Sequence, residues 1–298
     1  MTTPTMAAWW REGGLHYGQR PPPQLARPDE VSVRVVLTGI CRTDVALAAG
    51  WLPCPEPRVL GHEVAGLVES VGPRVTRWRP GDRVAVRPLI PGPTGRERLG
   101  QERDGGFAEL LVVPETALVR VPDRLDWRRA AYVEPVAAAL AITRAPLAGT
   151  VGVVGEGRIA ELTRRVLAAM GFTPARGGGL DVAIDTGGTT ASLEQAMARV
   201  REGGLVVLKG RPPAPIAFDM TTAVLRELRF HAVGWAPFEE AFALLGSPDL
   251  PVDDLLGPVQ PLAALGELLA QADERTKYFV TPLPGGVGML PGTGSCVA

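Results

Sequence analysis

The chain has 298 residues, with 31 basic and 32 acidic side chains and 46% hydrophobic residues. This hydrophobic content is ample for a buried core, and the length favours two domains. The balanced charge provides no field that would gather nucleic acid or an anionic membrane surface. We therefore expect a small-molecule partner, and neither nucleic acid nor a membrane.

The N-terminal residues lack the basic start and apolar run of a secretory signal, and no later stretch has the length and apolarity of a membrane span. We expect a cytoplasmic protein. Its cysteines, Cys41, Cys54 and Cys296, are too few and too scattered for a disulfide framework.

The first part of the chain is typical of β-structure. Residues 31–37 alternate and then run apolar, and three more apolar segments follow at 63–72, 82–86 and 107–113 with Gly and Pro between them. From residue 151 the pattern changes to a short apolar strand, a glycine turn and an amphipathic helix, which opens a βαβ unit.

Later segments continue this α/β pattern. Strands are predicted at 180–188 and 204–210 with a helix over 191–204 between them, a further helix and strand over 218–234, and two helical stretches and a strand at 277–280 beyond Pro237. The Gly-rich tail from Pro284 has no period, so we expect a disordered end or an extended arm.

These patterns predict an α/β plus β fold. A β-rich domain would comprise residues 1–146, with 237–298 returning to it, and a parallel-sheet domain would comprise residues 147–236.

Two short motifs contain three types of metal-binding side chain. Cys41 lies in GICRTD at the end of a predicted strand, and His62 and Glu63 stand side by side in VLGHEVAG. Zinc accepts thiolate, imidazole and carboxylate, and an open catalytic site needs three protein ligands plus one exchangeable position. Taken alone, such residues are more often packing and surface residues.

Together with PGDRVAV and GGFAELLVV, these motifs resemble the zinc-containing medium-chain dehydrogenase family of alcohol, polyol and threonine dehydrogenases. The resemblance implies a GroES-like catalytic domain and a Rossmann-like domain. It makes Cys41 and His62 zinc ligands and Glu63 a ligand or a carboxylate close beside the metal. Thr43 would hold the substrate oxygen in a proton relay, and Asp44 would orient a ligand. The alternative for Thr43 is to cap the helix that follows.

Glu134 in VEPVAAAL matches the glutamate that polyol-type members of the family place at the zinc. The resemblance makes it an occasional fourth ligand. A glutamate in the first turn of a helix, favoured by the helix dipole and followed by Pro, explains the same residues without a metal. Both interpretations stay open.

Many family members carry a second, structural zinc, held by four cysteines between the PGDRV and GGFAE motifs. Residues 87–104 contain no cysteine, so this all-thiolate site cannot form here. We expect one zinc of the catalytic type. Family members use this lobe in subunit contacts, so the shortened lobe leaves it open whether the chain forms a homodimer.

Residues 153–160 keep the strand, tight turn and helix start of a dinucleotide-binding fingerprint. Gly155 and Gly157 would let backbone amides at a helix N-terminus hold a pyrophosphate. Confirmation would be a second strand ending in an acidic residue about 20 positions further on. Instead, Pro174 interrupts the next strand-like piece, and Gly177–Gly179 lead straight into the following strand.

This connection is too short for a complete dinucleotide-binding domain. A crossover between parallel strands needs roughly a dozen residues, whereas three glycines reach only about 10 Å. One or two βα units are therefore lost, and in the order 3-2-1-4-5-6 they form the edge that binds adenosine. Either the first helix has moved or the remaining strands are reordered. We expect NAD(P) to bind weakly or not at all. Arg176 stands where an NADP phosphate could bind, although we favour a solvated turn residue there.

Zinc ligands beside an incomplete nucleotide site lead us to favour a redox-cofactor-independent zinc enzyme. It would catalyse elimination, isomerisation or cyclisation of a small substrate with a hydroxyl or carbonyl group. The alternative is an NAD(P)-dependent zinc alcohol or polyol dehydrogenase. A catalytically silent zinc scaffold ranks third, because every expected ligand type is present.

Overall fold

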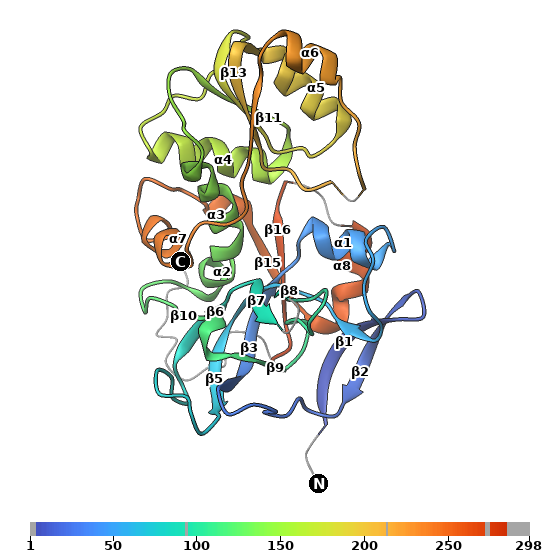
Figure 1. Cartoon of the computed structure of the whole chain (residues 1–298). Helices are drawn as coiled ribbons and strands as arrows, with labels where there is room; N and C mark the ends of the chain where they lie inside the picture. Colours follow the sequence, from blue (N-terminus) through green and yellow to red (C-terminus); the bar gives the residue numbers. More distant parts are fainter. Residues whose placement is uncertain (1–3, 93–94, 213, 272–274, 285–298) are drawn as a thin grey trace. The chain divides into compact units, whose positions relative to one another are not determined.

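The computed structural model describes residues 4–92, 95–212, 214–271 and 275–284. The chain forms two compact units, the first of Met1–Val133 with Leu256–Ala298 and the second of Glu134–Leu255 (Figure 1). The observed limits differ from the expected ones at residues 146 and 237, because the helices next to these positions group with the parallel-sheet unit. The tail predicted from Pro284 continues into residues 285–298, which lie outside the described residues.

The first unit is mainly β-structure, as expected. Its elements are β1 (Thr5–Arg11), β2 (Gly14–Arg20), β3 (Glu30–Gly39), α1 (Arg42–Ala48), β4 (Arg58–Val59), β5 (Glu63–Val71), β6 (Arg83–Val86), β7 (Leu89–Gly92), β8 (Gly95–Arg98), β9 (Leu110–Pro114), the 3-10 helix Glu115–Ala117, β10 (Leu118–Arg120), α2 (Trp127–Ala131), β15 (Leu256–Pro261), the 3-10 helix Leu262–Ala264, α8 (Leu265–Gln271) and β16 (Lys277–Thr281).

Strand β3 lies at the centre of the main sheet of this unit. The strand order is β10-β6-β5-β3-β16-β15, and β9 pairs with the first half of β3. Because β3 has neighbours along both edges, nearly all its residues are buried, and Val31, Val33 and Val35 form a core with Val64 and Val68 of β5. Each such valine contributes about 1.5–3 kcal/mol through burial. The strand predicted at 31–37 is confirmed.

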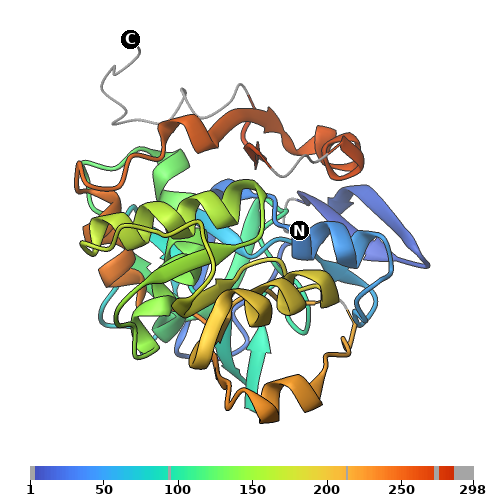
Figure 2. The same ribbon diagram turned by 90° about the horizontal axis from the view of Figure 1, so that it is seen from above.

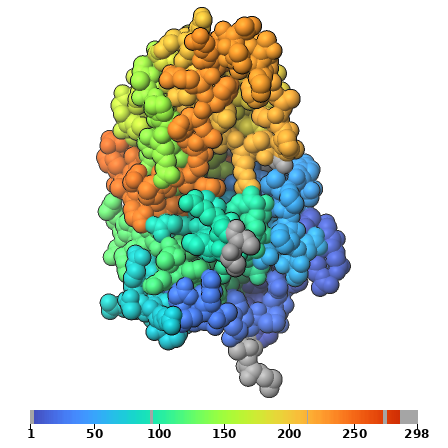
Figure 3. All heavy atoms as spheres, in the orientation of Figure 1, coloured from blue at the N-terminus to red at the C-terminus, as the bar shows by residue number. Residues whose placement is uncertain are grey.

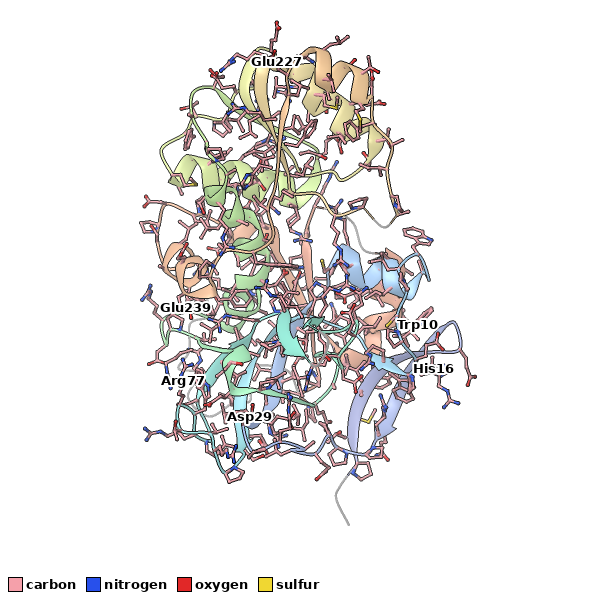
Figure 4. The ribbon with its side chains drawn as sticks, viewed as in Figure 1. Trp10, His16, Asp29, Arg77, Glu227 and Glu239 are labelled. Carbon is pink, nitrogen blue, oxygen red and sulfur yellow. The ribbon has the colours of Figure 1, made fainter. Side chains whose placement is uncertain are left out.

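The sequence patterns did not predict the N-terminal hairpin of β1 and β2. Its turn residues Glu12 and Gly13 both have positive φ, 52° and 72°, the backbone that a tight two-residue hairpin turn requires. Trp10 is buried at 8% exposure, whereas His16 is exposed and stacks on Trp9 with ring centroids 5.8 Å apart (Figure 4).

Ion pairs stabilise residues 87–104, the segment that in many family members holds the structural zinc, and join it to β3. Strands β7 and β8 form a hairpin, after which Arg98 pairs with Glu102. Arg103 lies 3.0 Å from Glu97 and 3.5 Å from Glu30, so it connects the hairpin to the start of β3. The partly exposed Arg98–Glu102 pair contributes modestly, about 0–1 kcal/mol.

The second unit contains a four-stranded parallel sheet with helices beside it. Its elements are α3 (Val133–Leu140), the 3-10 helix Ala141–Arg144, β11 (Val151–Val154), α4 (Gly157–Ala169), β12 (Leu180–Asp185), α5 (Thr190–Arg199), β13 (Val200–Leu208), α6 (Met220–Leu225), β14 (Arg229–Ala232), α7 (Phe238–Leu245) and the 3-10 helix Asp253–Leu255. Figure 2 shows α4 in yellow-green and α5 in gold beside this sheet.

The strand order β11-β12-β13-β14 follows the chain. The remaining strands are therefore not reordered. Of the two alternatives left open by the sequence, reordered strands or a moved first helix, this order excludes the first. A single parallel bridge between Ala175 and Gly152, with the Ala175 amide donating to the Val151 carbonyl at 2.8 Å, lies where a second strand would pair with β11. Among the described residues, this single bridge stands at the position of the expected second strand.

One predicted helix is shorter than expected. The prediction extended to residue 204, but α5 ends at Arg199, and Val200 opens β13. The physical reason is the sequence after Arg199: a β-branched valine favours extended backbone, and Gly203 takes φ 66° within the stretch from Val200 to Leu205, where the register with β12 shifts.

Exposed apolar residues gather around α6 in the second unit. Met220, Val224 and Leu225 are 66–74% exposed, and the segment from α6 to β14 lies on the surface shown in orange in Figure 3. Glu227, with φ 51°, makes the turn between these two elements (Figure 4). Such a patch is typical of a contact surface, and the homodimer that the sequence left open stays untested.

Among the residues that the structure describes, none of the helices has the length and apolarity needed to cross a membrane.

Candidate active site and metal centre

Cys41, His62 and Glu63 come together in the first unit. One ligand atom from each lies within 4.8 Å of the others. Cys41 follows β3 and is the N-cap of α1, while Glu63 opens β5 directly opposite Gly39 of β3. Because β3 and β5 are paired, the two motifs meet at the same end of the strand pair.

Asp44 connects both motifs by hydrogen bonds. Its Oδ2 accepts the backbone N–H of Cys41 at 2.8 Å, and its Oδ1 accepts that of Gly61 at 3.2 Å. The same Oδ1 lies 3.3 Å from Nδ1 of His62, and Asp44 is fully buried. A carboxylate on Nδ1 leaves Nε2 of the ring for a metal and fixes the ring orientation.

His62 is buried, with only 7% exposure. Burial by itself lowers the pKa of this imidazole, but the charges of Asp44 and Cys41 outweigh it and raise the pKa well above the ordinary value. In the metal-free protein the pocket therefore attracts a cation, either a proton on His62 or a metal ion.

Thr43 lies inside the first turn of α1, with Oγ1 3.7 Å from the Sγ atom of Cys41. The N-cap of this helix is Cys41, so the alternative that Thr43 caps the helix is wrong. The reason is that α1 begins at Arg42, two residues earlier than a cap at Thr43 requires. Its hydroxyl is partly exposed beside the thiol, which suits the expected proton relay.

Lys277 is a fourth charged residue at this site, which sequence reasoning missed. It is fully buried, its Nζ lies 2.5 Å from both carboxylate oxygens of Glu63, and it donates to the Ile40 carbonyl at 2.8 Å. The available signal was a lysine at the start of the otherwise apolar strand 277–280, where a charge needs a partner.

Glu134 lies in the second unit, in the first turn of α3, and is buried at 5% exposure. Trp235 donates from Nε1 to Oε1 of Glu134 at 2.6 Å. Sequence reasoning missed this partner, which is 101 residues away. The role of Glu134 as a fourth ligand stays a prediction.

The glycine turn after β11 has backbone conformations that favour glycine. Gly155 and Gly157 have φ values of 115° and 78°, and a Cβ at position 155 would lie 2.4 Å from Oγ1 of Thr186. Only glycine fits there, and α4 begins directly at Gly157. Arg176 is exposed immediately after the Ala175 bridge.

The donor set of the first unit fits zinc. Thiolate, imidazole and carboxylate are all zinc ligands, and Asp44 supplies the carboxylate partner that zinc-binding histidines usually have. The second unit fits a dinucleotide only in part, because it has the glycine turn and lacks the complete second strand.

Residues 27–123 match the family model described as the alcohol dehydrogenase GroES-like domain. The chain is 29% identical over 311 residues to the probable D-xylulose reductase A of Neosartorya fischeri, covering 82% of this chain and 87% of that protein. The matched region thus includes both units.

Solved structures with the same fold cover almost the whole chain. One is a protein from Sinorhizobium meliloti 1021 assigned as a zinc-binding dehydrogenase and bound to NADP, with 25% identity, a TM-score of 0.83, and coverage of 94% of this chain and 100% of that one. The 2R,3R-butanediol dehydrogenase of Bacillus subtilis shares the fold at 24% identity and a TM-score of 0.81, with the same coverage. Residues 27–123 therefore form an alcohol dehydrogenase GroES-like domain, and the chain as a whole is similar in sequence and fold to zinc-containing alcohol and polyol dehydrogenase-like enzymes.

Proposed function

We propose that this protein is an NAD(P)-dependent zinc dehydrogenase that interconverts a polyol or other secondary alcohol and the corresponding ketone. The observation that carries the proposal is similarity along both units to a D-xylulose reductase and to a zinc-binding dehydrogenase bound to NADP. This similarity makes the NAD(P)-dependent dehydrogenase, which the sequence left open as the alternative, the preferred function, and redox-cofactor-independent chemistry takes second place.

The residues have separate roles in this reaction. When bound, zinc supplies a Lewis acid at the substrate oxygen, and nicotinamide supplies the hydride donor or acceptor. Cys41 and His62 hold the metal, with Glu63 as a ligand or close beside it, and Asp44 keeps Nε2 of His62 directed at the metal through its contact with Nδ1. Thr43 would relay the proton: during oxidation its Oγ1 accepts the proton of the substrate hydroxyl while its own hydroxyl proton passes to water, and during reduction both transfers run in reverse.

Zinc-dependent elimination, isomerisation or cyclisation stays as a second candidate. The observation that favours it is the reduced nucleotide domain, in which one bridge at Ala175 replaces a strand. Adenosine contacts supply remote binding energy that orients nicotinamide, and losing them weakens the case for hydride transfer.

Fluorescence titration of the purified, zinc-loaded protein with NADH and NADPH tests the proposal. We expect both NADH and NADPH to bind saturably with dissociation constants above about 1 μM, which corresponds to a binding free energy of less than about 8 kcal/mol. We also expect the protein to oxidise a polyol in the presence of NAD(P)+. Nicotinamide mononucleotide serves as the comparison, because it lacks the adenosine half. We expect its affinity to lie within roughly 10-fold of that of NADH, since few adenosine contacts remain to be lost.

If neither dinucleotide binds and a hydroxy substrate is converted without NAD(P), the second candidate, zinc-dependent elimination, isomerisation or cyclisation, would be the function. Arg176→Ala provides an internal control for the phosphate. As an exposed turn residue, Arg176 should leave the ratio of NADPH to NADH affinity unchanged. A selective loss of NADPH affinity would make it a phosphate ligand.

A further inference from the structure

A buried ion pair lies across the centre of the main sheet at the metal cluster. Glu63 of β5 faces Gly39 of β3, and Gly39 in turn pairs with Phe279 of β16, the strand that Lys277 opens. A Cβ at position 39 would lie 2.1 Å from Oε2 of Glu63. The glutamate therefore reaches Lys277 over a glycine that leaves room for its carboxylate.

Lys277 binds this carboxylate closely and has few other partners. Its Nζ lies 2.5 Å from both Glu63 oxygens, and its remaining hydrogen bond is to the Ile40 carbonyl at 2.8 Å. Lys277 is 0% and Glu63 1% exposed, so water does not screen the pair. If Glu63 moved away, the buried ammonium would keep one neutral acceptor among the described residues, which is strongly unfavourable.

We propose that Lys277 is a positioning residue that holds Glu63 beside the metal and out of its coordination sphere. Both oxygens of Glu63 lie 2.5 Å from the ammonium, although only Oε1 accepts its hydrogen bond, so binding of either oxygen to the metal competes with the ion pair. Lys277 thereby keeps one coordination position free for an exchangeable ligand, as an open catalytic site requires. The inference rests on the proposed function only for the presence of a metal at Cys41 and His62, and it does not depend on nucleotide or on redox chemistry.

A purely structural ion pair has a different consequence. Its removal would lower the melting temperature and leave the coordination of the metal unchanged. The proposal instead requires the coordination itself to change once the ammonium is gone, because the released carboxylate becomes available as a ligand and a positive charge beside the metal disappears. Metal coordination is therefore the informative measurement.

Cobalt(II) replaces zinc in the test, since its visible absorption reports coordination number. Lys277→Met should shift the cobalt spectrum towards the weaker bands of higher coordination and tighten cobalt binding by roughly 10-fold, a change equal in size to the smaller losses seen when partners of metal ligands are removed. Lys277→Arg is the matched control, because it keeps the charge, and should retain the wild-type spectrum. In Lys277→Met combined with Glu63→Gln, the wild-type spectrum should return, because the new ligand is gone.

Lys277→Gln provides a second route if the Met variant does not fold, as it keeps an N–H donor for the Ile40 carbonyl and removes the charge. Its spectrum should shift in the same direction. An unchanged cobalt spectrum and affinity in a folded Met or Gln variant would overturn the proposal and leave Lys277 a structural residue. Loss of the wild-type spectrum in Glu63→Gln alone would also overturn it, by showing that Glu63 is already a ligand. Cobalt binding needs neither substrate nor NAD(P)H, so these results are separate from the nucleotide titration that decides the proposed function.

Discussion

The Asp44 carboxylate lies 3.3 Å from the Nδ1 atom of His62 and also accepts the backbone N–H of Cys41 at 2.8 Å. One buried side chain thus orients both of the expected zinc ligands. Asp44→Asn should keep much of the hydrogen bonding at the helix start but lose the negative charge at the imidazole. We expect zinc affinity to fall by roughly 10- to 100-fold, the usual effect of such partners.

Competition with a chelator measures this affinity, with the exposed Asp123→Asn as a charge-matched control in the same unit. Equal zinc affinity in the Asp44 and Asp123 variants would contradict a role of Asp44 in orienting the ligands.

The second prediction concerns metal content. Wild-type protein should contain about one zinc per chain, because one cluster of three ligand types occurs among the described residues and residues 87–104 contain no cysteine. Cys41→Ala should lose the zinc and the activity but keep its circular dichroism spectrum, since the core around β3 does not depend on the site.

Elemental analysis and circular dichroism on the same samples check this prediction. The partly buried Cys54→Ala is the control and should retain the zinc. Two tightly held metals per wild-type chain, or full activity in Cys41→Ala, would be incompatible with a single catalytic zinc at Cys41.

Thr43 is the subject of the third prediction. Thr43→Val nearly preserves the shape of the side chain and should preserve the zinc, yet it removes the hydroxyl beside Cys41. We expect the catalytic rate to fall by roughly 100-fold, as for other positioned proton-transfer groups. Thr43→Ser should retain most of the activity.

Because Thr43 is not the N-cap of α1, its replacement should change the melting temperature little. Rate and melting temperature need to be measured on the same preparations. Normal turnover in the valine variant would leave the proton relay without an assigned residue.

The fourth prediction concerns acid stability in the lobe without cysteines. In this lobe, the side-chain hydrogen bond from Arg98 lowers the pKa of Glu102 below the ordinary value for glutamate. A lowered folded pKa stabilises the protein above the unfolded value of about 4.3, and this contribution disappears as pH falls through the folded pKa. The free energy of unfolding should therefore decrease between about pH 6 and about pH 3, with about 0–1 kcal/mol of the change due to this partly exposed pair.

Urea unfolding of wild type and Glu102→Gln at several pH values tests the sign. The Gln variant should be less stable near neutral pH and approach the wild type in acid. A constant difference across the whole pH range would show that the charge of Glu102 is irrelevant to the stability of the lobe.

The sequence alone determined the chemical types at the site and the losses in both domains. The motifs GICRTD and GHEVAG contain the candidate ligands. Both motifs can be found in the sequence, because the first follows and the second opens a strand with a recognisable apolar pattern. The missing structural zinc follows from composition. The lost βα units follow from covalent reach, since Gly177–Gly179 cannot span a crossover between parallel strands.

Only the tertiary structure decided which residues, distant in the sequence, donate hydrogen bonds to the buried carboxylates. Lys277 is 214 residues from Glu63, and Trp235 is 101 residues from Glu134. Local periodicity indicates that a residue is buried, but strand order and register determine which side chains it meets. Lys277 reaches Glu63 because β16 pairs with β3 and because position 39 between them is glycine, a combination of three separate segments that no local pattern specifies.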